Sequence, residues 1–504
     1  MYFRTLGVHH FHILNGPLTA EFEVTVKYVR RELRDLTDDD RSRYFAALAV
    51  LYNVDQEDGE RIYGSQFKSI GWLVREHLYG AADKSCDHWH DDAGFINHHV
   101  GITMQLEKAL QTVDASVAAH YWDYTVDAEL DDWTSSTIFD DEWFGPASPN
   151  NTAHIVDRGT WAYTKIMEKA SGFSVIHNPY GLLRSPWNTN PTPYVTRSRF
   201  VLGLKDSGYG IPSCTQFQDA VSVQMWIGTA FSYLNGLLHG PVHIMTGGQW
   251  WADVDRHESD QIEQWLSEAF TLANRTDSSA DILLSSKYLW RQGIVRCPDY
   301  CSSDTPQEYC ECHCPHDLIG VRTAYDAMYD YGIYHLNEEW IAPVMNILNE
   351  KHGLGYDTML HLMCHVGHAG EMFTSAAPYD PLFWPLHGLA ERFVAFKRIL
   401  SDKGVGTLNE TWGYHHEGNL PSDVAHICDW TNVTEVGLPH CYKGTCPGHR
   451  AEDILSQSNF LGTGDTYTLS EFYEFLSPFN TDLPYVYDSF TQWPGCTAEG
   501  IDMV

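Results

Sequence analysis

The chain has 504 residues, of which 43% are hydrophobic and 20% charged, and its formal net charge is −35 at pH 7. This composition supplies enough apolar side chains for a large folded core. The strong negative charge disfavours nucleic acid and anionic membranes as partners. The sequence has no apolar run of about 18 residues, so we expect no membrane-spanning helix.

The predicted elements are mainly helical. Residues 18–52 are predicted to form a helical pair, because apolar residues recur at three- and four-residue spacing and the acids Asp38–Asp40 are typical of a helix N-terminus. Residues 95–112 are predicted to form the next helix. Residues 125–215 are rich in Trp, Asn, Pro and Gly, which favours irregular loops. Residues 216–238 are again predicted to be helical.

Histidines recur at helical offsets in three places, as His90 with His99, His239 with His243, and His387. Imidazole is a ligand that suits copper, zinc, iron and nickel. His239 and His243 are four residues apart, so both rings project from one face of a helix and can reach one ion. Two such groups that face each other across a four-helix core would hold a pair of metals.

The surroundings of these histidines resemble known motifs. Phe95-Ile-Asn-His-His99 with Glu107 is similar to the copper-A motif of the type-3 copper proteins, the family of tyrosinases, catechol oxidases and haemocyanins. His90 lies nine residues before His99, which is the family's usual separation of its second and third copper-A ligands. By the same resemblance His77, in Val-Arg-Glu-His77-Leu, is the expected first ligand.

The copper-B half of the resemblance has three parts. His239-Gly-Pro-Val-His243-Ile-Met-Thr-Gly-Gly248 resembles the first copper-B motif. Asp380-Pro-Leu-Phe-Trp-Pro-Leu-His387 resembles the second, and Tyr485-Val-Tyr487 resembles the motif that closes the family's core domain. The metal ligands implied by the resemblance are therefore His77, His90, His99, His239, His243 and His387.

Alternatives remain in both halves. His88 competes with His90, because Cys86-Asp-His88 has the spacing of a Cys-x-His thioether found in some family members, and a plain disulfide at Cys86 is the other reading. His361 and His365 form a second His-x-x-x-His, and His365 lies only 22 residues before His387. We favour His239 and His243 because the residues on both sides match the motif better.

The resemblance implies a fold of the mainly α class, with a four-helix bundle that holds a dinuclear copper site and is wrapped by long loops. About 140 residues separate His243 from His387, where the family has a few tens, so the two copper-B motifs are predicted to flank a large insertion. We expect residues 1–504 to form a single tyrosinase-like copper domain in which residues 250–365 are an insertion subdomain.

The implied activity is that of a copper-dependent o-diphenol:oxygen oxidoreductase, in which two copper ions use O2 to oxidise a phenolic small molecule, an o-diphenol, to an o-quinone. Family tyrosinases commonly place a Glu before the first copper-B His and an Asn after it, to hold a basic water. Here Asn235 and Gly240 stand in that region, which favours a catechol oxidase over a true tyrosinase. A monophenol-hydroxylating tyrosinase and a haemocyanin-like oxygen carrier are the alternatives. A dinuclear zinc hydrolase is disfavoured because the motifs contain no carboxylate ligand.

The cysteines and sequons indicate the compartment. Cys297, Cys301, Cys310, Cys312 and Cys314 lack the Cys-x2-Cys spacing of zinc fingers, so disulfides are favoured over a zinc or copper-loading site. The chain has twelve cysteines and glycosylation sequons at four asparagines, Asn150, Asn274, Asn409 and Asn432. Together they favour a secreted glycoprotein. The N-terminus lacks a recognisable signal, so either the signal has been removed or the protein is not secreted. The Tyr-x-Tyr motif lies 17 residues from the end, from which we expect no C-terminal lid domain.

Overall fold

The computed structural model describes most of the chain, namely residues 5–81, 89–90, 94–168, 178, 180–184, 189–222, 233–250, 256–275, 286, 289–290, 295–302, 304–306, 309–314, 338–365, 367–406, 408–411 and 451–503. Its strands are short, apart from the first two: β1 (Gly7–Asn15), β2 (Leu18–Val26), β3 (Tyr28–Arg30), β4 (Phe200–Val201), β5 (Leu204–Lys205), β6 (Gln249–Trp250), β7 (His368–Ala369) and β8 (Tyr485–Tyr487). Its α-helices are α1 (Asp38–Asn53), α2 (Gln56–Tyr63), α3 (Ile70–Ala81), α4 (Gly94–Val113), α5 (Cys214–Ser222), α7 (Gly240–Gly247), α8 (Arg256–Ala273), α12 (Glu338–His352), α13 (Tyr356–Cys364), α14 (Phe383–Asp402), α15 (Leu469–Phe475) and α16 (Pro494–Ala498).

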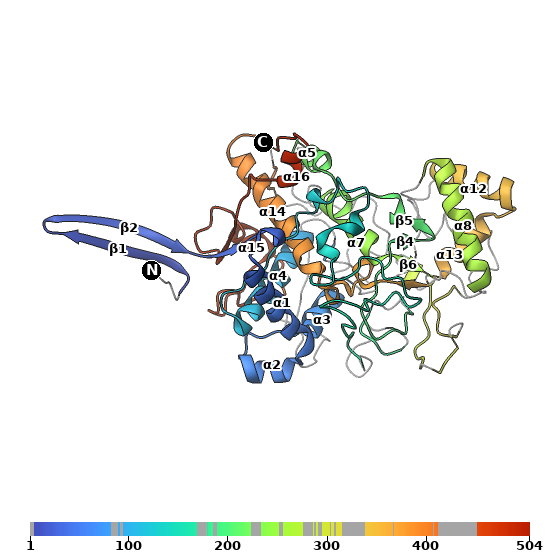
Figure 1. Cartoon of the computed structure of the whole chain (residues 1–504), viewed down its shortest axis with the longest axis horizontal. Helices are drawn as coiled ribbons and strands as arrows, with labels where there is room; N and C mark the ends of the chain where they lie inside the picture. The colour runs from blue at the N-terminus through green and yellow to red at the C-terminus, as the bar shows by residue number, and fades with distance from the viewer. Residues whose placement is uncertain are drawn as a thin grey trace.

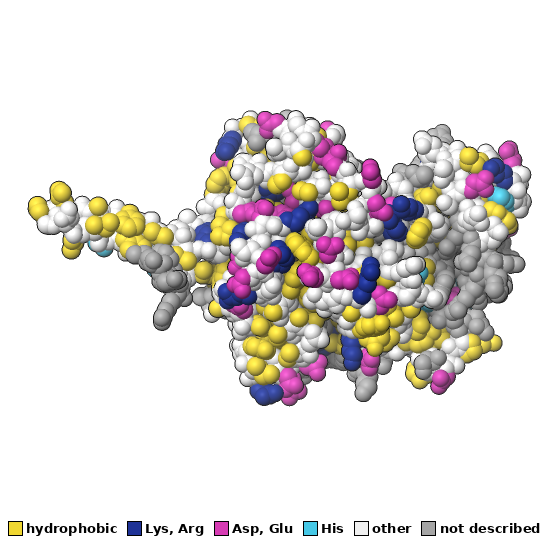
Figure 2. Space-filling view, viewed as in Figure 1, with side chains coloured by type: hydrophobic (Ala, Val, Ile, Leu, Met, Phe, Trp, Pro, Cys, Tyr) yellow, Lys and Arg dark blue, Asp and Glu magenta, His cyan; other side chains and the backbone are white. Residues whose placement is uncertain are grey.

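The first predicted helix is wrong, because its residues form strands. β1 and β2 make an antiparallel hairpin that projects from the body of the molecule (Figure 1). Apolar and polar residues alternate along β2, as Leu-Thr-Ala-Glu-Phe-Glu-Val-Thr-Val, and this period of two outweighs the helical spacing. Several of its apolar side chains are exposed, and Figure 2 shows them along the hairpin.

The Tyr-x-Tyr segment lies against the N-terminal part of the chain. β8 pairs in parallel with β3, so that Arg30 is aligned with Tyr487. The Arg30 guanidinium is fully buried and forms ion pairs with Glu107 of α4 at 2.8 Å and Glu391 of α14 at 2.7 Å. A buried charge is stable only when it is paired and hydrogen-bonded. Arg30 therefore links the central helices α4 and α14 to the paired strands β3 and β8, which come from opposite ends of the chain.

The central helices confirm the mainly helical fold class. α4 packs against α1, α3 and α14, and nearly every side chain in its first four turns is buried (Figure 1). A helix that is apolar on all sides belongs in the interior. α1 begins as predicted, because the Thr37 hydroxyl accepts a hydrogen bond from the backbone N–H of Asp40. The described residues between 125 and 213 are mostly turns and short 3-10 segments, in agreement with the loops predicted for residues 125–215, although α5 already begins at Cys214.

A second hydrophobic cluster lies away from the central helices. It contains side chains from α8, α12 and α13, which gather at the opposite end of the molecule from the hairpin (Figure 1). The helices predicted within residues 250–365 are thus present, and α8 packs on α12. That these residues form an insertion subdomain stays a prediction.

The described cysteines form four disulfides, Cys214–Cys496, Cys297–Cys312, Cys301–Cys310 and Cys314–Cys364. The prediction of disulfides for the cysteine-rich run is therefore confirmed. Cys86, Cys428, Cys441 and Cys446 lie outside the described residues, and so do His88 and the two readings of Cys86. Among the described helices, none has the length and apolarity needed to cross a membrane.

Candidate dinuclear metal centre

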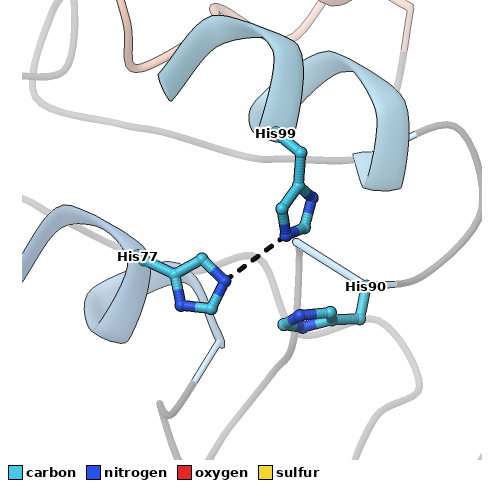
Figure 3. A group of neighbouring side chains, drawn as sticks. All are labelled: His77, His90 and His99. Carbon is cyan, nitrogen blue, oxygen red and sulfur yellow. Dashed lines mark hydrogen bonds between the residues drawn. The ribbon is translucent and has the colours of Figure 1, made fainter. Parts of the chain in front are cut away.

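The first histidine group comes from two helices and the loop between them. His77 lies on α3, His90 in the loop, and His99 on α4 (Figure 3). One ring nitrogen from each lies within 4.8 Å of the other two. The Nε2 atoms of His77 and His99 are 3.3 Å apart. His77 and His99 are 1% and 2% exposed, so the group lies in the interior of the protein.

The second group consists of His239, His243 and His387, whose ring nitrogens also lie within 4.8 Å of one another. His239 ends a π-helical turn, Leu234–His239, and α7 restarts at the next residue with Pro241 in its first turn. Proline is tolerated there because its missing N–H has no partner to lose. The helix restart therefore absorbs the cost of Pro241, and His239 and His243 share one face with their Nε2 atoms 2.8 Å apart.

The two groups lie side by side. The rings of His99 and His387, one from each group, are stacked with their centroids 4.3 Å apart. The ring of Phe383 lies within 6.0 Å of His99 and His243, again one from each group. Phe95 contacts His99 and His239 from another direction. The arrangement gives two adjacent three-nitrogen sites with apolar walls.

Backbone carbonyls select the tautomer of three of the rings. His77 Nδ1 lies 2.7 Å from the carbonyl oxygen of Ser375, His99 Nδ1 2.7 Å from that of Phe95, and His243 Nδ1 2.8 Å from that of Met372. A carbonyl oxygen only accepts hydrogen bonds, so each Nδ1 carries the proton and each Nε2 presents a lone pair. These Nε2 atoms are the ones that converge within each group.

Nε2 lone pairs that point at one another are stable only with a cation between them. A proton is disfavoured as that cation, because burial opposes protonation of these rings. Burial lowers the pKa of His243 to about 4 and holds the pKa values of His99, His239 and His387 well below the ordinary value for histidine. Both ring nitrogens of His387 are buried without a hydrogen-bond partner, which is costly unless something else binds them. Three neutral imidazoles around one point fit a copper ion, so the residues present fit a dinuclear copper site.

The two residues predicted to replace the water-holding pair lie at the π-helical turn. The Asn235 side-chain amide donates a hydrogen bond to the carbonyl oxygen of His90, at 2.8 Å. The Gly240 N–H donates to the carbonyl oxygen of Asn235, and a Cβ at Gly240 would lie 2.7 Å from that oxygen. Asn235 therefore links the two histidine groups, because its side chain bonds to the backbone of His90 and its own carbonyl accepts from the residue that follows His239. Gly240 has no side chain that could hold a water.

His365, from the competing pair, belongs to neither histidine group. His365 follows α13, which belongs to the second hydrophobic cluster, and the side chain of His361 lies outside the described part of the structure. Glu107 is engaged by Arg30 and by the backbone N–H of Ala119. The roles of the Met372 and Ser375 carbonyl groups could not be predicted from the sequence, because a backbone acceptor leaves no signal in residue identity.

Part of the chain is similar to known proteins. Residues 43–267 match the family model described as the common central domain of tyrosinase. A tyrosinase of Streptomyces antibioticus is 26% identical over 250 residues, which span 48% of this chain and 79% of that protein. Over this part, which is less than half of its length, the chain resembles the tyrosinase family of type-3 copper proteins. The tyrosinase-like protein tyr-3 of Caenorhabditis elegans is 27% identical over 148 residues, or 29% of this chain and 18% of that protein.

Two solved structures also align with most of the chain. A polyphenol oxidase variant of Thermothelomyces thermophila is 14% identical and covers 92% of this chain and 89% of its own, with a TM-score of 0.37. A tyrosinase of Burkholderia thailandensis is 13% identical and covers 94% of this chain and 77% of its own, with a TM-score of 0.36. The match to the tyrosinase family model ends before His387, so the inclusion of His387 in the centre depends on the motif around it and on the geometry of the second histidine group.

Proposed function

We propose that this protein belongs to the tyrosinase family and uses O2 to oxidise o-diphenols to o-quinones. His77, His90 and His99 would hold one copper, and His239, His243 and His387 the other. When bound, a copper pair supplies the two-electron oxidation by O2. The protein fixes the rings by the three carbonyl contacts and keeps Nε2 free of protons. Phe95 and Phe383 supply apolar walls beside the rings.

The observation that carries the preference for o-diphenols is the hydrogen bond from Asn235 to the His90 carbonyl. Hydroxylation of a monophenol requires the phenol to lose its proton near neutral pH, where a free phenol is protonated. A polar pair that holds a basic water would assist this step. The Asn235 amide is already used in another hydrogen bond, and Gly240 adds no side chain. A diphenol loses a proton more easily and depends less on such a pair.

Oxygen uptake tests the proposal. Copper-loaded protein is given tyramine or dopamine, which differ by one hydroxyl group, and the initial rates are compared at equal concentration. We expect rapid uptake with dopamine and uptake at least tenfold slower, after a lag, with tyramine. Comparable rates without a lag would instead support a true tyrosinase. Reversible O2 binding without turnover of either phenol would support an oxygen carrier.

We further propose that the protein is secreted and glycosylated. The four disulfides support this, since disulfides persist in oxidising compartments. The sequon residues Asn150, Asn274 and Asn409 are exposed, and Asn432 lies outside the described residues. Glycosidase treatment of the protein from its natural host should lower its mass. An unchanged mass together with free thiols would contradict the proposal.

A further inference from the structure

One segment contributes a backbone acceptor to each histidine group. We call residues 370–380 the strap, because they run from β7 to the start of α14 across both groups. Within the strap, the Met372 carbonyl accepts from His243, and the Ser375 carbonyl accepts from His77. The position of the strap therefore decides whether these two rings present Nε2 to a metal.

Two buried ion pairs hold the strap near its ends. At the start, the Glu371 carboxylate lies 3.0 Å from Arg184. At the end, Asp380 accepts two hydrogen bonds from Arg197, at 2.6 and 2.7 Å. All four side chains are completely buried. Both arginines belong to the irregular region that precedes β4, so this region anchors the strap at both ends.

Further hydrogen bonds hold the Glu371 end of the strap. Glu371 Oε2 accepts from the backbone N–H of Thr196 at 2.6 Å and from its hydroxyl at 3.0 Å. Arg184 in turn donates to the carbonyl oxygens of Thr192 and Tyr194. A buried carboxylate with this many donors has one orientation, because each lost hydrogen bond would leave a buried polar group unsatisfied. Its neighbour in sequence, Met372, carries the carbonyl that meets His243.

The strap also touches the end of α7 directly. A Cβ at Gly247 would lie 2.2 Å from the backbone nitrogen of Phe373, and a Cβ at Gly370 would lie 2.3 Å from the carbonyl oxygen of Gly247. Only glycine permits backbones to approach this closely. The helix that carries His243 and the strap that orients its ring are therefore in direct backbone contact, and the Gly-Gly exit of the copper-B motif has a structural purpose.

We propose that Glu371 is a positioning residue, which holds the Met372 carbonyl against His243 and thereby sets the affinity of the copper bound by His239, His243 and His387. This inference rests on the proposed metal centre and adds to it a residue that touches neither metal nor substrate. Loss of a partner that orients a metal-binding histidine typically costs about 10–100-fold in metal affinity.

The test compares Glu371→Gln with Glu107→Gln. Both replacements neutralise a buried glutamate paired with an arginine, but Glu107 lies on α4, two turns beyond His99, and makes no contact with the strap. Copper is removed by titration with a competing chelator, and the copper that remains per chain is measured. The melting temperature of each metal-free protein is measured in parallel.

Both variants should melt below the unmodified protein. Only Glu371→Gln should release one of two coppers at a roughly 10–100-fold lower chelator concentration. In a His243→Ala background, adding Glu371→Gln should leave the affinity for the remaining copper unchanged. Equal copper affinity in Glu371→Gln and Glu107→Gln, with similar loss of melting temperature, would overturn the inference.

Different results contradict the proposed function and the role of Glu371. An unmodified protein that binds fewer than two coppers contradicts the proposed function itself, whatever the variants do. If Glu371→Gln does not fold, Thr196→Ala replaces it, because that change removes the hydroxyl donor to Glu371 and, besides this, only a 3.3 Å acceptor for the Asn190 amide. A weaker shift in the same direction supports the role of Glu371, and an unshifted affinity overturns it.

Discussion

Single hydrogen bonds determine what the histidine rings can do. In three of the six rings, a carbonyl oxygen takes the Nδ1 proton, so that Nε2 is available to a metal. The rings differ in what orients them: His99 bonds within its own helix, to Phe95, while His77 and His243 depend on the strap. The copper-B ring of His243 is therefore more sensitive than His99 to changes elsewhere in the chain.

The choice between the two His-x-x-x-His pairs can be tested by paired substitution. His243→Ala should lose one copper and nearly all activity, because one of three nitrogens at that site disappears. His365→Ala should leave the copper content near two per chain and cost stability by ~1–3 kcal/mol, as is usual for a half-buried residue in a packed region. Metal analysis and melting curves measure both effects. Copper loss in His365→Ala alone would show that the assignment is wrong.

Gly240→Asn would restore a carboxamide after His239. It should raise the rate on a monophenol relative to its diphenol, because an amide there could help to hold a water. It should also lower the melting temperature, because the new Cβ would lie 2.7 Å from the Asn235 carbonyl oxygen, which must then move. Gly240→Ala is the control: it carries the same Cβ without the amide. If both variants show the same rate ratio, the amide has no role.

Among the elements, disulfides join segments that are far apart in sequence. Cys214 in α5 is bonded to Cys496 in α16, 282 residues later, and Cys314 is bonded to Cys364 at the end of α13. The first bond closes the central core, and the second holds α13 to the cysteine-rich loop. A cross-link limits the freedom of the unfolded chain more when the loop that it closes is longer.

Removal of Cys214–Cys496 should therefore cost more stability than removal of Cys301–Cys310, which spans only 9 residues. By chain entropy alone the losses are roughly 5–6 and roughly 2–3 kcal/mol. The double variants Cys214→Ser/Cys496→Ser and Cys301→Ser/Cys310→Ser are compared by denaturant unfolding of the metal-free protein. Equal losses would mean that native packing, rather than loop length, controls the stabilisation.

In the whole molecule, the metal centre lies in the larger hydrophobic core, and the second cluster contains α8, α12 and α13. The large core buries histidines as well as apolar residues. This burial makes the stability of the metal-free protein depend on pH, since a buried neutral ring cannot take up a proton without cost.

The direction follows from the pKa values. Burial lowers the pKa of His120 to about 3 and that of His243 to about 4, from an ordinary value of 6.5. The unfolded chain therefore binds protons first, and this stabilisation is complete above about pH 6.5 and lost as the pH falls towards 4. Burial raises the pKa of Glu32 to about 7 and that of Glu76 to about 8, so their contributions are instead lost as the pH rises from 4.5 through those values.

Because the lowered pKa values of His99, His239 and His387 act in the same direction as those of His120 and His243, the melting temperature of the metal-free protein should fall between pH 6.5 and pH 4. Thermal unfolding at several pH values measures this. A melting temperature that stays level or rises on acidification would show that the carboxyl groups dominate.

Copper binding depends on the fold of the whole molecule, since each site takes its ligands from separate elements. We expect two coppers per chain, and a near-ultraviolet absorption band that appears when the reduced, copper-loaded protein meets O2 and disappears when O2 is removed. One zinc per chain, or the absence of the band after reduction and aeration, would contradict a dinuclear copper centre.

The resemblance to the tyrosinase family, the mainly helical class and the candidate histidines could all be predicted from the sequence, because ligand spacing on a helix is a local property. It failed for Leu18–Val26, where both a helical and an alternating pattern could be read. Strand pairing decided that segment, since β1 lies within reach to form the hairpin. The pairing of β3 with β8 likewise joins residues more than 450 positions apart, which no local pattern encodes.

The sequence left two His-x-x-x-His pairs open, and the three-dimensional fold shows which of them meets His387. Spacing to His387 favoured His365, and the fold instead places His239 and His243 beside His387, because the intervening residues leave and return at the paired strands β6 and β7. Likewise, the orientation of His77 and His243 depends on carbonyl groups of the strap. Every residue has a carbonyl group, so residue identity carries no record of which ones face a metal; three-dimensional packing alone selects them.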